Sequence, residues 1–270
     1  MKKLTQEAIV PPKKLSLFIS YTQKDETYLD ELETHLKTLV RQNLIAPWSR
    51  KNLLPGTESK AETAQKLGYS DIVLLMISPH LIASDDFWTE EMPIALRRHQ
   101  NLESVVIPVL LRPVYWEDTQ ISELQVLPRN KQPVQRWAER DEAYACIVAE
   151  IREVVESVYR RRLNRRDYQE FLEKSLGRKY VINDELRTNL QERAKSLSLH
   201  QQEIHRIEVD VLNKKRVDFN KRINNLEIYD TFYREKLLEI NSSTVLRTVL
   251  DKKLSELLLD SSDADVLRIE

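Results

Sequence analysis

The sequence predicts an α/β domain with a parallel sheet covered by helices, followed by a separate all-helical domain. Short apolar runs alternate with helical patterns from residue 13 to about residue 157. Residues 71–77 and 105–111 are nearly continuous apolar runs, as expected for strands buried on both faces. Strand signals end after residue 159, and residues 160–270 hold one glycine, no proline and many helix formers.

The elements of the first domain follow one another in a regular order. Strands are predicted at residues 15–20, 44–48, 71–77 and 105–111. Helices are predicted at residues 28–42, 62–67, 87–99 and 141–159. The first helix carries leucines at helical spacing: Leu29, Leu32, Leu36 and Leu39. Because strand and helix alternate, the strands should run parallel, with helices on both faces of the sheet.

The second domain is predicted to contain four or five helices. Asn183 is a candidate N-cap for a helix over residues 184–197, and residues 198–201 have the spacing of a capping box that opens the next helix. Helical patterns continue to residue 240, and Ser243 or Thr244 is expected to cap a last helix that ends near residue 259.

These patterns divide the chain into four segments. We expect a flexible tail at residues 1–12, an α/β domain at 13–157, a basic linker helix at 158–175 and a helical bundle at 176–270. Residues 261–265 should form a frayed end. We expect the helical bundle to sense a signal, to dock a regulatory protein or to drive assembly, with passive stabilisation as the alternative.

Composition and charge exclude several classes of protein. The net charge is −1, so no global field attracts nucleic acid or an anionic membrane. No apolar run is long enough to cross a bilayer, and the N-terminal residues lack the apolar core of a signal peptide. A single cysteine, Cys146, excludes an internal disulfide framework, and we expect its thiol to be buried on an amphipathic helix. These features predict a soluble, cytoplasmic protein.

Other kinds of functional site are also disfavoured. No G-x-S-x-G elbow and no glycine-rich phosphate loop occurs, which argues against a serine hydrolase and a P-loop NTPase. The five histidines lack the spacing of metal ligands, so no metal site is expected. The arginine run at residues 160–166 has no interleaved aromatic residues, so a solvated interdomain helix is favoured over nucleic-acid binding.

Several motifs occur in the order that one family has. Residues 18–21 have the sequence F-I-S-Y, a loop ends in Leu-Pro-Gly at Gly56, and residues 70–79 look like a central strand. Residues 84–96 contain the pattern E-x-x-x-A-L, which begins at Glu91. Together these motifs resemble a bacterial TIR (Toll/interleukin-1 receptor) domain over residues 13–157. The resemblance implies a flavodoxin-like parallel sheet flanked by helices.

The resemblance also implies an activity. TIR enzymes of the type that this chain resembles cleave the bond between nicotinamide and ribose in NAD+, and they act in bacterial defence or signalling after self-assembly through TIR–TIR contacts. The catalytic carboxylate of the family matches Glu91. NAD+ would be the substrate and no cofactor is implied, with ADP-ribose or cyclic ADP-ribose as the second product. A solvated helix glutamate is the alternative interpretation of Glu91.

Candidate substrate-binding residues come from the segments that match the family's site: Ser20, Tyr21, Trp48, Arg50, Lys51, Gly56, Phe87 and Trp88. Gly56 is expected in a turn with positive φ. Phe87 and Trp88 either hold a flat ring or pack in the core. Arg50 and Lys51 would meet a pyrophosphate, or they belong to a solvated loop. Ser20 would donate to the ligand, or it only ends the strand.

Two departures from the family keep a second function open. The family often has tryptophan at the position of Phe87, and aspartate at the position of Arg50. A non-catalytic TIR scaffold that signals through homotypic contacts is therefore the alternative to an NAD+-cleaving enzyme.

Overall fold

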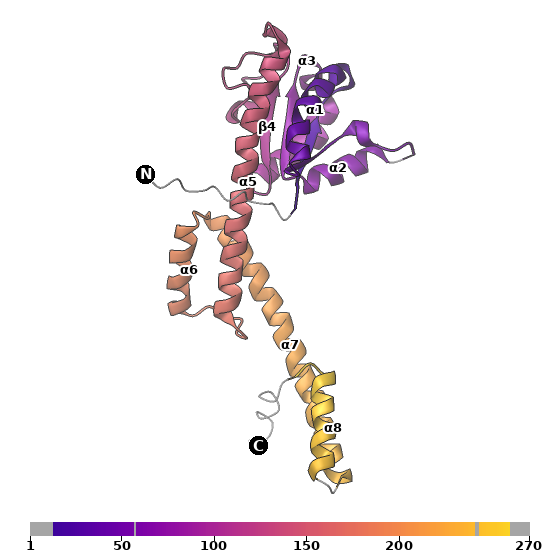
Figure 1. Cartoon of the computed structure of the whole chain (residues 1–270), viewed down its shortest axis with the longest axis vertical. Helices are drawn as coiled ribbons and strands as arrows, with labels where there is room; N and C mark the ends of the chain where they lie inside the picture. Colours follow the sequence, from indigo (N-terminus) through magenta and orange to yellow (C-terminus); the bar gives the residue numbers. More distant parts are fainter. Residues whose placement is uncertain (1–12, 57, 241–242, 260–270) are drawn as a thin grey trace. The chain divides into compact units, whose positions relative to one another are not determined.

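The computed structural model describes residues 13–56, 58–240 and 243–259 (Figure 1). The tails predicted at residues 1–12 and 261–265 lie outside the described residues. The chain divides after Leu163 into two compact units. The boundary falls within one helix, α5 (Arg140–Leu176).

Four parallel strands form the sheet of the first unit, in the order β2-β1-β3-β4. Their bounds are β1 (Leu15–Ser20), β2 (Ile45–Ser49), β3 (Ile72–Ile77) and β4 (Val105–Leu110). The predicted parallel sheet is confirmed, and each strand lies within one residue of its predicted bounds. Because β1 pairs with β2 on one side and β3 on the other, the order reverses at β1, where open α/β sheets bind ligands.

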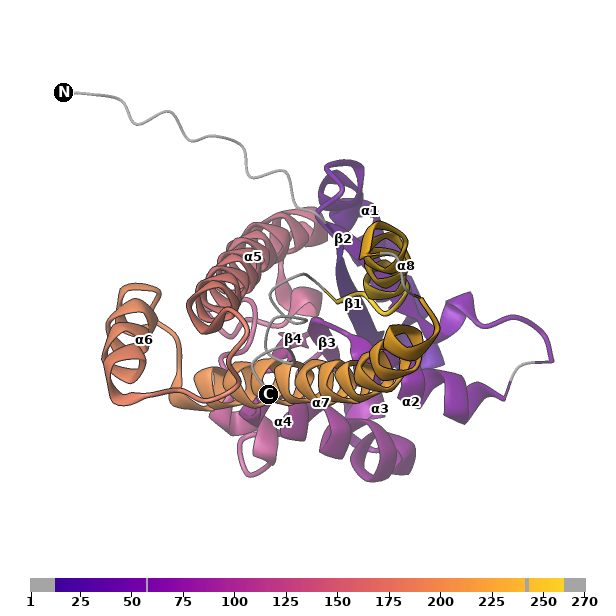
Figure 2. The ribbon, with the colours of Figure 1, turned by 90° about the horizontal axis from the view of Figure 1, so that it is seen from below.

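Helices cover both faces of this sheet. They are α1 (Glu26–Arg41), α2 (Ser59–Tyr69), α3 (Pro79–Ile82), the π-helical turn η3 (Phe87–Glu91), α4 (Met92–Gln100) and α5. Short 3-10 turns lie at η1 (Gln23–Asp25), η2 (Arg50–Asn52), η4 (Gln120–Glu123) and η5 (Val134–Arg136). Figure 2 shows α1 and α5 on one side of the strands, with α2, α3 and α4 on the other.

Alternate residues of each strand enter different cores. Leu17 and Leu74 pack with α1 and α5 on one face, whereas Phe18 and Val73 pack with α2 and α4 on the other. All six residues of β3 are buried, because helices remove both of its faces from water. This packing explains why the central strands are apolar throughout.

The expectation for Cys146 is wrong, because its side chain is exposed. The buried stripe of α5 in this region runs through Ala143, Ile147 and Ile151. Cys146 directly precedes Ile147, so it lies about 100° around the helix from that stripe and faces outward.

The arginine run is less solvated than expected. Arg162 forms an ion pair with Asp71 within the first unit, and Arg165 donates to Glu203 Oε1 at 2.6 Å within the second. Both arginine side chains are half-buried. These guanidinium groups are therefore engaged with carboxylates of the protein itself.

The second unit is helical, as predicted. It contains the last turns of α5 together with α6 (Asp184–Ser196), α7 (Gln201–Glu239) and α8 (Ser243–Glu256). Tyr168 and Leu172 pack with α6 and the first half of α7, and a separate cluster joins Tyr229 to α8. No helix in the described part of the chain is both long and apolar enough to cross a membrane.

The caps of this unit agree with the sequence in one case and differ in two; α8 begins at Ser243, so Ser243 and Thr244 lie inside the helix rather than before it. Asn183 caps α6, where its Oδ1 accepts from the Leu186 amide at 3.0 Å. The N-cap of α7 is His200, and the Glu203 side chain accepts from its amide at 3.1 Å. Ser198 was expected to open this capping box, but its φ of +51° places it in the turn that ends α6.

Candidate active site

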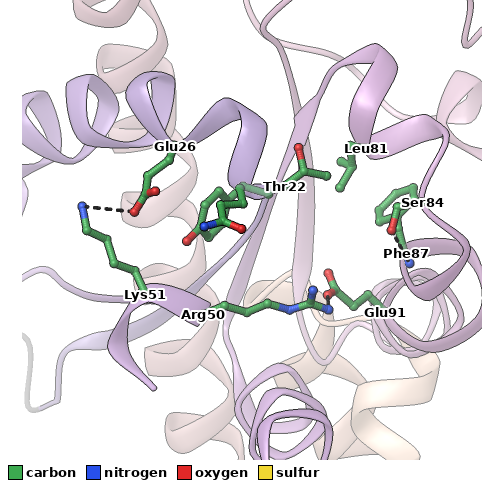
Figure 3. A pocket seen from close by; sticks show the side chains of 10 residues that line it. Thr22, Glu26, Arg50, Lys51, Leu81, Ser84, Phe87 and Glu91 are labelled. Atoms are coloured by element: carbon green, nitrogen blue, oxygen red, sulfur yellow. Dashed lines mark hydrogen bonds and ion pairs between the residues drawn. The ribbon is translucent and has the colours of Figure 1, made fainter. Parts of the chain in front are cut away.

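A cleft of about 460 Å³ lies beyond the carboxyl ends of β1 and β2 (Figure 3). Ten residues from four segments line it: Tyr21, Thr22, Gln23, Glu26, Arg50, Lys51, Leu81, Ser84, Phe87 and Glu91. This is the edge of the sheet at which the strand order reverses, as expected for a ligand site in an open α/β fold.

Glu91 is the buried carboxylate of this cleft, and its residue is 5% exposed. Ser20, the last residue of β1, donates its hydroxyl to Glu91 Oε2 at 2.5 Å. Arg50 Nη2 donates to the other oxygen, Oε1, and Figure 3 shows the arginine side chain extended toward Glu91. The alternative of a solvated helix glutamate is therefore excluded for Glu91.

A π-helical turn brings Glu91 into the cleft. The Met92 amide donates to the Phe87 carbonyl, a bond that spans five residues rather than four. Pro93 follows and has no amide hydrogen, so the α-helical bond is missing at that position. Phe87 and Glu91 both line the cleft, whereas Glu90 points away and accepts from Lys60 at 2.6 Å. The helix that the sequence predicts over residues 87–99 therefore begins with this π-helical turn.

Burial raises the pKa of Glu91 above the ordinary value for a glutamate. The Arg50 guanidinium and the Ser20 hydroxyl oppose this effect, because both favour the ionised form. The carboxylate is therefore held in a poorly hydrated environment where it interacts strongly with any cation that enters.

Arg50 and Lys51 lie on the turn η2, directly after β2. Asn52 Oδ1 accepts from the Ser49 amide at 2.9 Å, which fixes the start of this turn. Lys51 pairs with Asp30 and lies 3.9 Å from Glu26. Both cations of the loop are thus paired with carboxylates across the cleft or beside it.

The loop after β1 contributes residues that we had not predicted as site residues. Thr22, Gln23 and Glu26 line the cleft, and the signal for them was the polar stretch that follows F-I-S-Y. The fully buried Asp25 holds this loop, because its Oδ2 accepts from Thr22 at 2.8 Å and from Ser78 at 2.5 Å.

A further contact completes the support beneath the loop. Arg112 Nε lies 3.0 Å from Asp25 Oδ1, and its guanidinium lies 5.0 Å from the centre of the Tyr28 ring. Asp25 therefore joins the loop after β1 to residues that follow β3 and β4. Leu81 and Ser84, which come after β3, form the remaining wall of the cleft.

Comparison with known proteins agrees with this fold. Residues 17–148 match the family model of the TIR domain. This chain contains a TIR domain. An uncharacterized protein of Sinorhizobium fredii, y4lF, is 34% identical over 145 residues. The match covers 54% of this chain and 45% of y4lF, so the chain spans less than half the length of that relative.

Four of the residues expected to bind substrate do not line the cleft of the TIR domain: Ser20, which reaches it only through its contact with Glu91, and Trp48, Gly56 and Trp88. Trp48 stacks on Phe18, with ring centres 5.4 Å apart, because the two residues are neighbours in the sheet register. Trp88 donates its Nε1 hydrogen to the Ile82 carbonyl at 2.7 Å and lines a different groove. Gly56 has the predicted positive φ, +87°, but lies farther along the loop.

Six of the expected residues do come together in the TIR domain. Tyr21, Arg50, Lys51 and Phe87 line the cleft with Glu91, and Ser20 contacts Glu91 from the end of β1. Within the described ranges, no cluster of three or more histidine, cysteine, aspartate or glutamate side chains could hold a metal ion.

Proposed function

We propose that this chain cleaves NAD+ between nicotinamide and ribose, with Glu91 as the catalytic carboxylate. The observation that carries the proposal is a buried carboxylate at the ligand-binding edge of a TIR domain, beside Phe87. Arg50 and Lys51 supply positive charge in the same cleft. A dinucleotide with a cationic ring and an anionic pyrophosphate fits this arrangement of charges.

The chemistry of the step determines what the site must provide. When the C1′–N bond breaks, its electron pair goes to the pyridinium nitrogen, so nicotinamide leaves as a neutral molecule. The positive charge remains on the ribose as an oxocarbenium-like centre, which a nearby carboxylate stabilises. Water then attacks C1′ and releases a proton, giving ADP-ribose. If an adenine nitrogen attacks instead, the product is a cyclic ADP-ribose.

The residues around Glu91 have positioning roles in this proposal. Ser20 donates to Oε2 and fixes the orientation of the carboxylate. Phe87 lines the cleft but is almost fully buried, so it would form the floor beneath a planar base. The low hydration of Glu91 strengthens its attraction for the developing cation.

Self-assembly and biological role are part of the proposal. Because residues 17–148 match the TIR family model, we propose that the enzyme acts in the bacterial cytoplasm as a defence or signalling effector that works when TIR domains associate. The helical second unit would receive the signal or drive that association.

A scaffold without catalytic activity is the second candidate. The specific observation in its favour is the ion pair between Arg50 and Glu91, which occupies the carboxylate that catalysis requires. In this case TIR–TIR contacts alone would carry the signal.

Incubation of the purified full chain with NAD+ at high protein concentration distinguishes the two candidates. The enzyme account predicts nicotinamide release that falls by about 10²–10³-fold in Glu91→Ala. Glu90→Ala is the matched control, because Glu90 lies on the same turn but points away from the cleft. Equal release by wild type and Glu91→Ala, with the same elution volume, rejects Glu91 as the catalytic residue.

A further inference from the structure

The two partners of the ion pair at the centre of the cleft, Arg50 and Glu91, differ in burial. Glu91 is buried, whereas about a third of the Arg50 side chain is exposed. Both oxygens of the carboxylate are engaged, one by Ser20 and the other by Arg50. A ribose hydroxyl that approaches Glu91 therefore competes with the arginine.

We propose, resting on the proposed function, that Arg50 is the specificity-determining residue of this cleft: it occupies Glu91 until the pyrophosphate of a dinucleotide draws it away. Arg50 is suited to this exchange because a guanidinium binds carboxylate and phosphate oxygens with the same paired geometry. Its backbone is held by the capped turn η2, so the side chain can move while its anchor stays fixed.

The charges of the substrate match the exchange. NAD+ carries a cationic pyridinium and an anionic pyrophosphate. As Arg50 moves to the pyrophosphate, the pyridinium and its ribose replace it beside Glu91, so the buried carboxylate keeps a positive neighbour. A nucleoside such as nicotinamide riboside has the cation but lacks the pyrophosphate, and it cannot attract Arg50.

Neighbouring charges assign this role to Arg50 rather than to Lys51. Lys51 also lines the cleft, but its ammonium group pairs with Asp30, whose side chain is about half exposed. An exposed ion pair of this kind contributes little free energy, because water can solvate either group when the pair breaks. Breaking it therefore does not change the environment of a buried carboxylate. Arg50 is the lining cation whose departure changes the environment of Glu91.

The affinity of the full chain for ADP-ribose, measured by calorimetry, tests the exchange without any need for turnover. If Glu91 and the pyrophosphate compete for Arg50, Glu91→Gln should tighten ADP-ribose binding several-fold. Arg50→Gln should weaken it by about tenfold. In the double variant, Glu91→Gln should no longer tighten binding, because its effect depends on Arg50.

Arg129→Gln is the matched control, since Arg129 also pairs with carboxylates, Glu150 and Glu153, but lies outside the cleft. It should bind ADP-ribose as wild type does. The proposal is overturned if Glu91→Gln leaves binding unchanged or weaker, if its effect persists without Arg50, or if wild type does not bind ADP-ribose.

The ratio of kcat/KM for NAD+ to that for nicotinamide riboside supplies the second readout. It should be high in wild type and should fall by about tenfold in Arg50→Gln. Turnover that needs Glu91, with an unchanged ratio, overturns the exchange and leaves the proposed function standing. The opposite result is also possible to distinguish. If Glu91→Gln tightens ADP-ribose binding only when Arg50 is present, but the chain releases no nicotinamide, the exchange stands and the proposed function alone is rejected.

Discussion

Replacing Glu91 by glutamine should stabilise the TIR domain at neutral pH while it abolishes catalysis. The side chain of Glu91 is 7% exposed, so its charge has little contact with water. Glutamine has nearly the same shape and retains an oxygen that can accept from Ser20. Arg50 loses its partner but is partly exposed, so water can solvate it at small cost. We expect a gain of about 1 kcal/mol, typical of relieving a strained active-site group.

The dependence on pH follows from the direction of the pKa shift. Because the pKa of Glu91 is raised in the folded state, the folded protein holds a proton at pH values where the unfolded chain has released it. The stability of wild type therefore falls as the pH rises through the window between the unfolded and folded pKa values. The advantage of Glu91→Gln should be complete above the folded pKa and should vanish below the ordinary glutamate value.

Urea denaturation followed by tryptophan fluorescence measures this difference in the TIR domain. All four tryptophans lie before residue 163, so their fluorescence reports unfolding of the first unit. A gain of about 1 kcal/mol corresponds to a rise in Tm of roughly 2–4 °C for a domain of this size. Glu90→Gln is the control and should change stability by less than about 0.5 kcal/mol. A Glu91→Gln protein that is less stable than wild type at neutral pH, or one whose gain grows on acidification, would refute this reasoning.

Three further predictions concern the same cleft. Arg50→Gln should move the acid limb of the pH profile of kcat/KM for NAD+ to higher pH, because Arg50 lowers the pKa of Glu91; an unmoved limb contradicts this. Phe87→Leu should raise KM for NAD+ by about tenfold. Trp88→Phe should change KM for NAD+ by less than about twofold, since Trp88 lies outside the cleft. A larger rise in KM from Trp88→Phe than from Phe87→Leu would contradict the assignment of Phe87 to the substrate. Asp25→Asn should cost about 3 kcal/mol in urea denaturation, because it breaks the ion pair of a fully buried carboxylate with the half-buried Arg112 and weakens two hydrogen bonds; a loss below about 1 kcal/mol contradicts that role.

The sequence predicts the sheet well because period and composition reflect burial directly. Strands between two helical layers must be apolar throughout, and the β3 segment is readily recognised for that reason. The exposure of Cys146 depends instead on the exact rotation of α5 above the sheet. A stripe of apolar residues defines the rotation of a helix only to about 100°, the angle between consecutive residues, so the exposure of a single thiol was mispredicted.

The site was predictable as a set of segments but not as a set of contacts. Order along the chain places Glu91 and the loop after β2 near one edge of the sheet. The pairing of Arg50 with Glu91, 41 residues apart, depends on the three-dimensional fold and on the π-turn before Pro93. The sequence assigns Trp48 to the substrate, yet its register with Phe18 stacks it, partly buried, against the core.

A structure of the full chain bound to a non-cleavable NAD+ analogue would test the central claim most directly. The account predicts that the nicotinamide ribose lies against the Glu91 carboxylate, with Arg50 turned away from Glu91 onto the pyrophosphate. An analogue bound at another surface, with the Arg50–Glu91 ion pair still intact, would contradict it.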